Sequence, residues 1–330
     1  LKVVVRRIPG SLPNLLSRFA SDMFWLARYM ERAEALARLI DISKNYAGTD
    51  DDGTSWRRIL RICGDLETYQ EAGHALDGPS VLAFYLLDDT NPTSVAYSLK
   101  AARENARGAR HIISTELWTH LNTLHNTYSR LTARDIWISN VSNVCQDIKI
   151  GCQAFEGIIE STMSRGDLWS FYELGKHIER ADQTTRVLDI GYISLSSGDD
   201  DALVSVQWNT LVRALAGYHL YRSKFPAGQY ARDVATFLLF EPEFARSVAS
   251  CTDAISGVLA TLAKRLPMVP TDTIGTAQLA LTTALEAGPE QPITPAKLHA
   301  FLDGLQLSLG EVSEAIATTY FGKTEDSLVA

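Results

Sequence analysis

Apolar residues recur at alternating steps of four and three along two long stretches of the chain, at about residues 14–45 and 168–195. This spacing places apolar side chains along one side of an α-helix. We therefore predict two long helices, each buried along one face. The stripe of the first helix consists of Phe19, Met23, Leu26, Met30, Ala33, Ala37 and Ile40, and that of the second of Phe171, Leu174, Ile178, Ala181, Thr185 and Leu188.

The polar positions of these two stretches correspond as well. Glu31-Arg32 in the first stretch matches Glu179-Arg180 in the second, and the alignment continues around them without a gap. Each stretch carries a second stripe that reads acid, acid, arginine, acid at steps of three and four, so its members are neighbours on a helix. These stripes are Glu31, Glu34, Arg38 and Asp41, and Glu179, Asp182, Arg186 and Asp189, with Arg28 and Arg32 beside the first and Lys176 and Arg180 beside the second.

Two interpretations of the charged stripes are open. They can be solvated faces, on which each ion pair contributes little to stability. Alternatively, both stripes face inward across a pseudo-twofold axis and form a buried charge network or an anion-binding site. Buried carboxylates and guanidinium groups must be paired, so the second interpretation requires the stripes to bind one another.

Shorter segments later in each half also correspond. They pair Trp56 with Trp208, Tyr69 with Tyr221, Val81–Leu86 with Val234–Leu239, and Ser94 with Ser247. Alternating β-type runs are almost absent, which favours an all-α class. We predict a helical bundle built from an internal duplication of about 150 residues.

The duplication predicts the division of the chain. Residues 1–13 form a lead-in or linker, residues 14–165 the first half and residues 166–330 the second, and the two halves pack as one domain. Within the first half we expect one helix over residues 55–71 and a long helix over residues 133–163.

Composition narrows the classes of function. Hydrophobic residues make up 46% of the chain, which is enough for a sizeable core. The 31 basic and 39 acidic residues give a net charge of −8, which disfavours a nucleic-acid-binding surface. No apolar run approaches the ~18 residues of a membrane span, and four scattered cysteines without a CxxC pair favour a reducing compartment. We predict a cytoplasmic protein that binds neither nucleic acid nor membrane.

Recognisable catalytic motifs are absent from the sequence, which contains no GxGxxG, GxxxxGK[ST], HExxH or GxSxG pattern. Glu173 and His177 are four apart on one helix face, and carboxylate and histidine ligands on bundle helices form di-iron sites, but those sites use Glu-x-x-His in each of two helices. However, the corresponding residues of the first stretch are Trp25 and Tyr29, so the ligand pattern is not repeated. We therefore expect no metal, and whether the chain is an enzyme stays open.

A charged segment, Arg103-Glu-Asn-Ala-Arg-Gly-Ala-Arg110, has no charged counterpart in the second half. Its arginines share one side of the expected helix. Either this is a solvated face that pairs with itself, or it is the asymmetric element at which a specific site is built.

Residues 16–38, 84–107 and 171–189 resemble the sequence blocks of the bacterial alpha-E family, and the resemblance spans nearly the whole chain. It implies an all-helical protein encoded beside, or fused after, a circularly permuted ATP-grasp ligase of the kind expected to form peptide or amide bonds. The lead-in at 1–13 is similar to the junction of the fused versions. The resemblance places ATP and Mg only in the ligase partner, and no cofactor in this chain. The residues that fall on the family motifs are Glu31, Arg32, Glu34, Arg38, Glu104, Asn105, Arg107, Glu179, Arg180, Asp182 and Arg186.

We expect a helical accessory or substrate-binding domain that partners the ATP-grasp ligase and binds its peptide or amino-acid substrate, with arginines holding carboxylates as bidentate forks. An alternative is an enzyme in which Glu31 or Glu179 is the general acid or base, which requires a raised carboxyl pKa. A third possibility is a purely structural or interaction domain. The candidate substrate-binding residues are Arg28, Glu31, Arg32, Glu34, Arg38, Glu104, Asn105, Arg107, Arg110, His177, Glu179, Arg180, Asp182 and Arg186.

Overall fold

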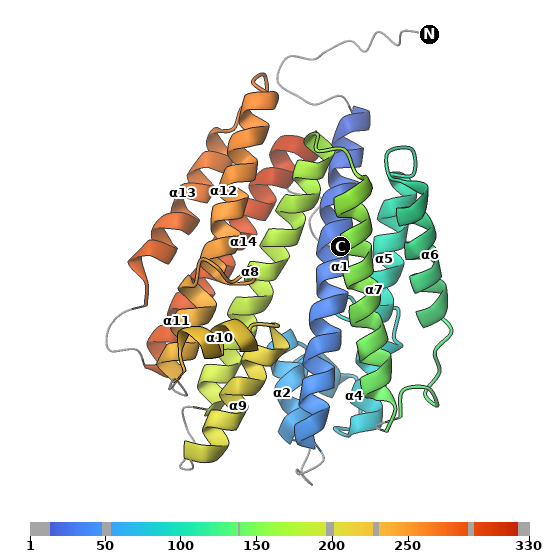
Figure 1. Ribbon diagram of the computed structural model, residues 1–330, viewed down its shortest axis with the longest axis vertical. Coiled ribbons are helices and arrows are strands. Elements are labelled where there is room, and N and C mark those ends of the chain that lie inside the picture. Colours follow the sequence, from blue (N-terminus) through green and yellow to red (C-terminus); the bar gives the residue numbers. More distant parts are fainter. Residues whose placement is uncertain are drawn as a thin grey trace.

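The computed structural model describes residues 14–47, 54–137, 139–195, 201–226, 231–289 and 294–322. Within these ranges the regular structure is helical throughout, with no strand, so the predicted all-α class is confirmed (Figure 1). The expected lead-in at 1–13 lies outside the described residues. None of the helices within these ranges is both long enough and apolar enough to cross a membrane.

The described helices fall into two consecutive series. The first series is α1 (Asn14–Ala47), α2 (Thr54–Cys63), α3 (Leu66–Glu71), α4 (Gly78–Leu86), α5 (Val95–Gly108), α6 (Thr115–Tyr128) and α7 (Val141–Thr162). The second is α8 (Asp167–Leu195), α9 (Asp201–Ala214), α10 (Tyr218–Lys224), α11 (Ala231–Phe240), α12 (Val248–Arg265), α13 (Asp272–Ala287) and α14 (Pro295–Ile316), followed by a π-helical turn, η1 (Ala317–Phe321).

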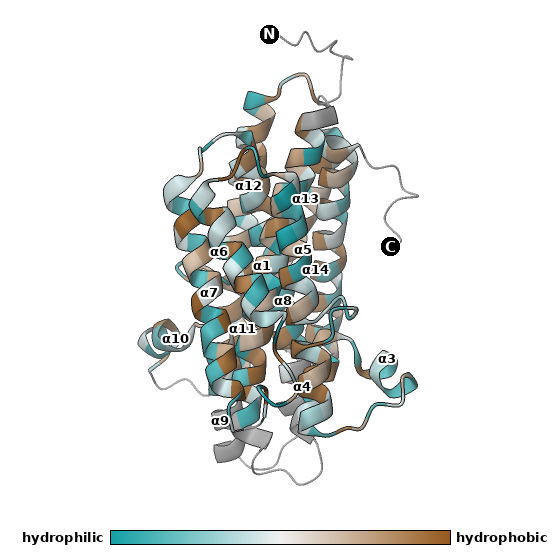
Figure 2. Cartoon of the chain, turned by 90° about the vertical axis from the view of Figure 1, so that its right-hand side faces the viewer, coloured by the Kyte–Doolittle hydropathy of each residue, from teal (hydrophilic) through white to brown (hydrophobic). Residues whose placement is uncertain are grey.

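The two long helices that carry the repeated stripes, α1 and α8, lie side by side at the centre of the bundle (Figure 1). Helices α5 and α7 pack on α1, whereas α12 and α14 pack on α8. The short helices α3 and α10 lie to either side of one end of the bundle (Figure 2). The order of elements follows the same sequence in both series, but the internal duplication itself stays a prediction from the sequence.

Close packing of α1 on α8 depends on small residues and on the two apolar stripes. From Met23 to Ile40 the first stripe is at most 4% exposed, and the second is buried over its whole length. A Cβ atom at Gly175 would lie only 2.1 Å from the carbonyl oxygen of Phe24, so only glycine permits the two backbones to approach this closely. The predicted burial of one face of each long helix is therefore confirmed.

Two helix boundaries predicted from the sequence are wrong. The helix expected over 55–71 is broken at Gly64, whose φ of +78° ends α2 in a left-handed turn. The helix expected over 133–163 begins only at Val141. In the preceding turn, Asp135 accepts hydrogen bonds from the backbone N–H of Thr132 at 2.8 Å and from its hydroxyl at 2.7 Å, and such local bonds compete with helix formation.

The turns before α5 and α12 are built alike. Ser94 caps α5 by accepting the N–H of Tyr97 at 2.9 Å, and Ser247 caps α12 by accepting the N–H of Ser250 at 3.0 Å. Each cap hydroxyl also donates to a carbonyl oxygen of the preceding turn. These turns place the residue before each cap, Thr93 or Arg246, beside the central helices.

Candidate functional site

Glu179, on the α8 face toward α1, is fully buried. Its carboxylate accepts hydrogen bonds from Arg28 Nε at 2.8 Å and from Arg32 Nε and Nη2 at 2.9 and 3.1 Å. Gln183, one turn further along α8, donates to the same carboxylate at 3.1 Å. Two arginines from one turn of α1 thus hold both oxygens of a carboxylate on α8.

The reciprocal arrangement holds Glu31, which is 6% exposed on α1. Arg180 of α8 donates its Nε to Glu31 at 2.8 Å, and Arg246, from the turn before α12, donates Nη1 at 2.9 Å. The two Glu-Arg pairs therefore cross between α1 and α8 in opposite directions, Glu31 to Arg180 and Glu179 to Arg32. For these residues the structure shows the buried network and not the solvated face.

The next acids of each stripe extend this network outward. Glu34 accepts hydrogen bonds from Arg38 Nε at 3.0 Å and from Arg246 Nη2 at 3.4 Å. Asp182 accepts a hydrogen bond from Arg186 Nε at 2.8 Å. Each half of the network consequently contains two acids, the first buried between the central helices and the second paired along its own helix.

The network holds its central carboxylates in the charged form. Burial opposes ionisation of Glu31, but the positive charges of Arg246 and Arg180 overcome it and lower its pKa to about 2. The same opposition between burial and the two bound arginines lowers the pKa of Glu179 to about 2. A general acid or base at neutral pH needs a pKa near 7, so this environment shifts both carboxyl groups in the direction opposite to that chemistry.

Positive charge exceeds negative charge in the network. Six arginines contact four carboxylates, because each acid pair faces three guanidinium groups. The neighbouring group of Lys176 with Glu156 and Glu173 carries one negative charge in excess, which leaves the combined cluster positive. Excess charge inside a protein is costly unless it is compensated, so this region of the bundle favours an anion.

A cavity of about 190 Å³ opens beside the network. Four arginines and two carboxylates line it, together with an apolar wall. The polar lining residues are Arg32, Arg38, Thr93, Glu179, Asp182, Gln183, Arg186 and Arg246, and the others are Ala35, Leu36, Leu39, Ile62, Cys63, Pro92, Val187, Ala214 and Leu215. This lining can hold an anionic group next to a short apolar body.

Some guanidinium groups at this cavity keep unused donors. Arg186 gives its Nε to Asp182, and its two Nη atoms have no hydrogen-bond partner within the described ranges. Arg38 and Arg32 each bind one carboxylate through Nε and Nη2, which leaves their Nη1 atoms without a partner in the same part of the chain. A planar guanidinium with free N–H groups is the side chain best suited to a carboxylate or phosphate.

The remaining candidates lie elsewhere. On α5, Glu104 and Arg107 are exposed and bind each other, and Asn105 donates to its own helix. Arg110, in the turn after α5, lies 5.4 Å from the centroid of the Trp118 ring. None of these four residues lines the cavity. His177 faces Glu173 at 3.4 Å, with its Nδ1 buried and unpartnered in the described residues, and it also lies outside the cavity lining.

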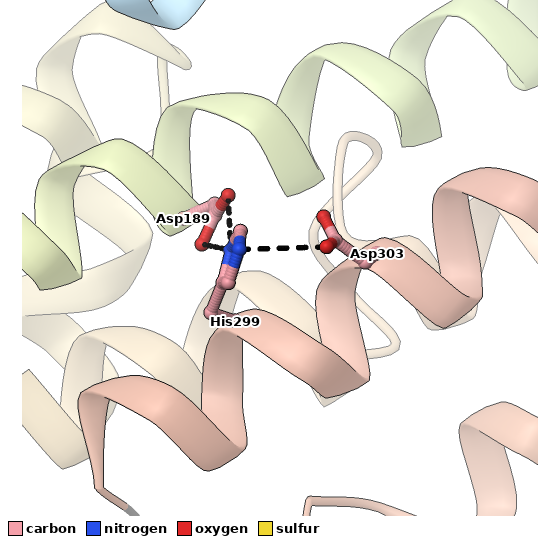
Figure 3. Close-up of side chains that lie close together, drawn as sticks. All are labelled: Asp189, His299 and Asp303. Carbon is pink, nitrogen blue, oxygen red and sulfur yellow. Dashed lines mark hydrogen bonds and ion pairs between the residues drawn. The ribbon is translucent and has the colours of Figure 1, made fainter.

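Asp189, the last acid of the α8 stripe, lies in a group of potential metal ligands with His299 and Asp303 of α14 (Figure 3). His299 Nδ1 lies 2.9 and 3.0 Å from the two oxygens of Asp189, while its Nε2 lies 3.4 Å from Asp303. Each ring nitrogen therefore faces a different carboxylate. The hydrogen bond to Asp189 raises the pKa of His299, whereas burial raises the pKa of Asp189. Because one metal ion cannot bind both sides of the ring, this geometry suits a protonated imidazole better.

Arg246 and Gln183 are site residues that the sequence reasoning missed. Arg246 directly precedes Ser247, the residue matched with Ser94, where the corresponding position is Thr93. The sequence did contain a signal for Arg246, because a charged residue stands before Ser247 where the matched position before Ser94 is a threonine. Gln183 lies within the second repeated stretch but off its charged stripe, so no pattern distinguished it.

Comparisons with known proteins match this description. Residues 15–321 match the family model Alpha-E, described as a predicted alpha-helical domain with a conserved ER motif. The dipeptide Glu-Arg occurs twice in this chain, at 31–32 and 179–180, and both copies form the centre of the network.

Mycobacterial proteins are similar to this chain at low identity. An uncharacterized protein of Mycobacterium bovis is 23% identical over 251 residues, and one of Mycobacterium tuberculosis strain H37Rv is 22% identical over 251 residues. In both cases the match covers 70% of this chain and 28% of the relative, so the matched region is less than a third of the length of those proteins. No solved structure matches.

Proposed function

This chain belongs to the Alpha-E family, and on that basis we propose that it is the helical accessory domain of an amide-bond-forming ATP-grasp ligase, in which it binds a peptide or amino-acid substrate through a carboxylate. In this proposal ATP and Mg bind to the ligase partner. The helical domain contributes recognition of the substrate and no bond-making step.

The observation that carries the proposal is the arginine-lined cavity beside the crossed Glu-Arg pairs. Arg186 offers two unpartnered Nη atoms at its edge, and Arg38 and Arg32 offer one each. Asp182, Glu34 and Glu179 hold these three arginines in place before any ligand arrives, which reduces the entropy lost on binding. The apolar wall of the cavity accommodates the part of the substrate next to its carboxylate.

The extent of the mycobacterial matches supports an accessory role. The region similar to this chain is 28% of each relative, so in those proteins a helical domain of this kind is accompanied by a longer additional sequence. A ligase domain in such a neighbouring region fits the proposal.

Calorimetric titration of the folded chain with short peptides and with their C-terminal amides tests the binding step. We expect the free acids to bind at least about tenfold more tightly, since a charge-assisted hydrogen bond contributes roughly 1.5–3 kcal/mol. Arg186→Gln should remove this difference. Arg107→Gln is the matched control, because Arg107 is an exposed arginine on α5 that binds Glu104. Equal affinity for acids and amides would contradict the proposal.

Steady-state kinetics of the complete ligase system test the role in catalysis. We expect Arg186→Gln to raise the KM for the carboxylate substrate and to leave kcat nearly unchanged, because removal of ground-state binding acts on KM. An unchanged KM together with a lowered melting temperature would favour the alternative of a purely structural domain. The crossed Glu-Arg pairs give that alternative its basis, because they join the two central helices.

A further inference from the structure

A second cavity, of about 380 Å³, lies between α1, α8 and α14. Its lining includes Trp25 and Arg28 of α1 and Leu309, Gly310 and Ser313 of α14. Arg28 crosses this region, donating Nε to Glu179 at 2.8 Å and Nη1 to Ser313 at 3.2 Å. Arg28 therefore links the second cavity to Glu179, the buried carboxylate that lines the first.

Three charged residues line both cavities. Arg32 projects from α1, and Asp182 and Arg186 project from α8. The Nη1 atom of Arg32 and the two Nη atoms of Arg186 have no hydrogen-bond partner in the part of the chain that the structure describes. These donors form the boundary between the two cavities, so an anionic group on either side can reach them.

The arginines of the two linings are already engaged to different degrees. Arg38 and Arg246 bind Glu34 and Glu31, which lie outside both linings, whereas Arg32 and Arg186 line both cavities and keep Nη donors without a partner in the described residues. A ligand with two anionic groups can place one group in each cavity, and each group then meets these donors.

We propose that the two cavities are compartments of one site for a dicarboxylate, such as an acidic amino acid or a peptide that ends in one, with one carboxylate on each side of the boundary formed by Arg32 and Arg186. The inference rests on the proposed function and adds the class of its substrate. The larger compartment beneath α14 takes the second carboxylate and the adjoining part of the ligand.

Gly310 provides a selective way to close the second compartment. It lines this compartment, and a Cβ atom built on it meets nothing within 4 Å, so a side chain can start from this position without a clash at its first atom. Gly304, on the same helix, is equally open but does not line either compartment. Both positions gain helix propensity when glycine is replaced, which makes Gly304→Phe the matched control for Gly310→Phe.

The test is calorimetric titration of the folded chain with glutarate and with pentanoate, which has the same number of carbon atoms but one carboxylate. We expect glutarate to bind at least about tenfold more tightly, from one additional set of charge-assisted hydrogen bonds. Gly310→Phe should abolish this advantage and leave pentanoate affinity unchanged, whereas Gly304→Phe should preserve it. If Gly310→Phe does not fold, Gln306→Glu, which adds a negative charge to the same lining, should weaken glutarate selectively.

The outcomes separate this inference from the proposed function. Equal affinities for glutarate and pentanoate, or an equal loss of both in Gly310→Phe, would overturn the two-compartment site while carboxylate binding stands. Failure of every carboxylate and peptide to bind would overturn the proposed function itself. Inorganic phosphate serves as the competing anion, and tighter binding of phosphate than of glutarate, with the same sensitivity to Gly310→Phe, would overturn the assignment to a dicarboxylate.

Discussion

The two acid pairs of the network face equal numbers of arginines but obtain them from different places. Glu31 and Glu34 share Arg246, which comes from the turn before α12. At the corresponding turn before α5, Thr93 lines the first cavity and donates its hydroxyl to Asp65 at 3.1 Å. Glu179 instead receives Arg28 from α1. Two helical series with the same order of elements thus hold an asymmetric site, because one turn carries a short side chain where the other carries an arginine.

The last acids of the two stripes differ in a similar way. Asp41 binds Lys149 of α7 at 2.6 Å, and Asp189 binds His299 of α14 at 2.9 Å. Both pairs join a central helix to the last long helix of its own series. Lysine stays charged through the neutral range whereas histidine titrates near it, so only the second pair responds to pH there.

The largest effect is expected from Glu179→Gln. Glu179 is the only carboxylate that binds Arg28 and Arg32 in the described residues, so its neutralisation leaves two half-buried guanidinium groups uncompensated, whereas Glu31→Gln leaves one. Removing one partner of a buried ion pair costs about 3–5 kcal/mol. Urea unfolding should show this loss for Glu179→Gln and a smaller one for Glu31→Gln. Equal losses would contradict the asymmetry.

Acid should destabilise the protein through the same two carboxyl groups. Their pKa values, at about 2, lie below the ordinary value of 4.5. The stability that they contribute is therefore fully present above about pH 5 and is lost as the pH falls toward 2. Unfolding free energies across this window should fall steeply for the unmodified chain and less steeply for the Glu31→Gln, Glu179→Gln double variant. Identical slopes would show that other groups control acid unfolding.

Substitutions in the two corresponding turns should have unequal effects. Arg246→Gln removes charge-assisted hydrogen bonds to two buried carboxylates and should cost about 2 kcal/mol. Thr93→Val removes one hydroxyl hydrogen bond to Asp65 and should cost about 1 kcal/mol. Thermal unfolding of both variants measures the difference, and a larger loss for Thr93→Val would reverse the comparison.

The smallest effect is expected at His299. Its pKa is raised by Asp189, so the stabilisation from the charged ring is present below about pH 6.5 and is lost as the pH rises through the raised value. His299→Gln should cost about 0.5 kcal/mol at pH 5.5 and almost nothing at pH 9, as expected for a half-exposed ion pair. Lys149→Gln should show no such dependence. Denaturant unfolding at the two pH values distinguishes them, and a pH-independent loss at His299 would exclude a charged ring.

The sequence alone determined the features that depend on residues close to one another along the chain. The apolar periodicity of α1 and α8 is repeated within a few turns, and it predicted both the helices and their buried faces. The positions of the Glu-Arg pairs and the family resemblance were also readable directly. The prediction was wrong at Gly64 and before Val141, where local interactions end a helix. A glycine with positive φ and a turn held by the side chain of Asp135 change the hydrophobic pattern very little, so the pattern did not reveal them.

Only the tertiary structure decided which way the charges face. A stripe of acids and arginines satisfies the same spacing whether it is solvated or buried, and the choice depends on the helix that packs against it. Arg246 and Glu31 are 215 positions apart, so no local pattern connects them. The same applies to the cavities, whose walls come from separate helices, and to Arg107, which the packing leaves exposed although the sequence around it resembles a binding site. Which charged side chains bind one another depends on their distance in the folded structure, and short-range sequence patterns do not determine that distance.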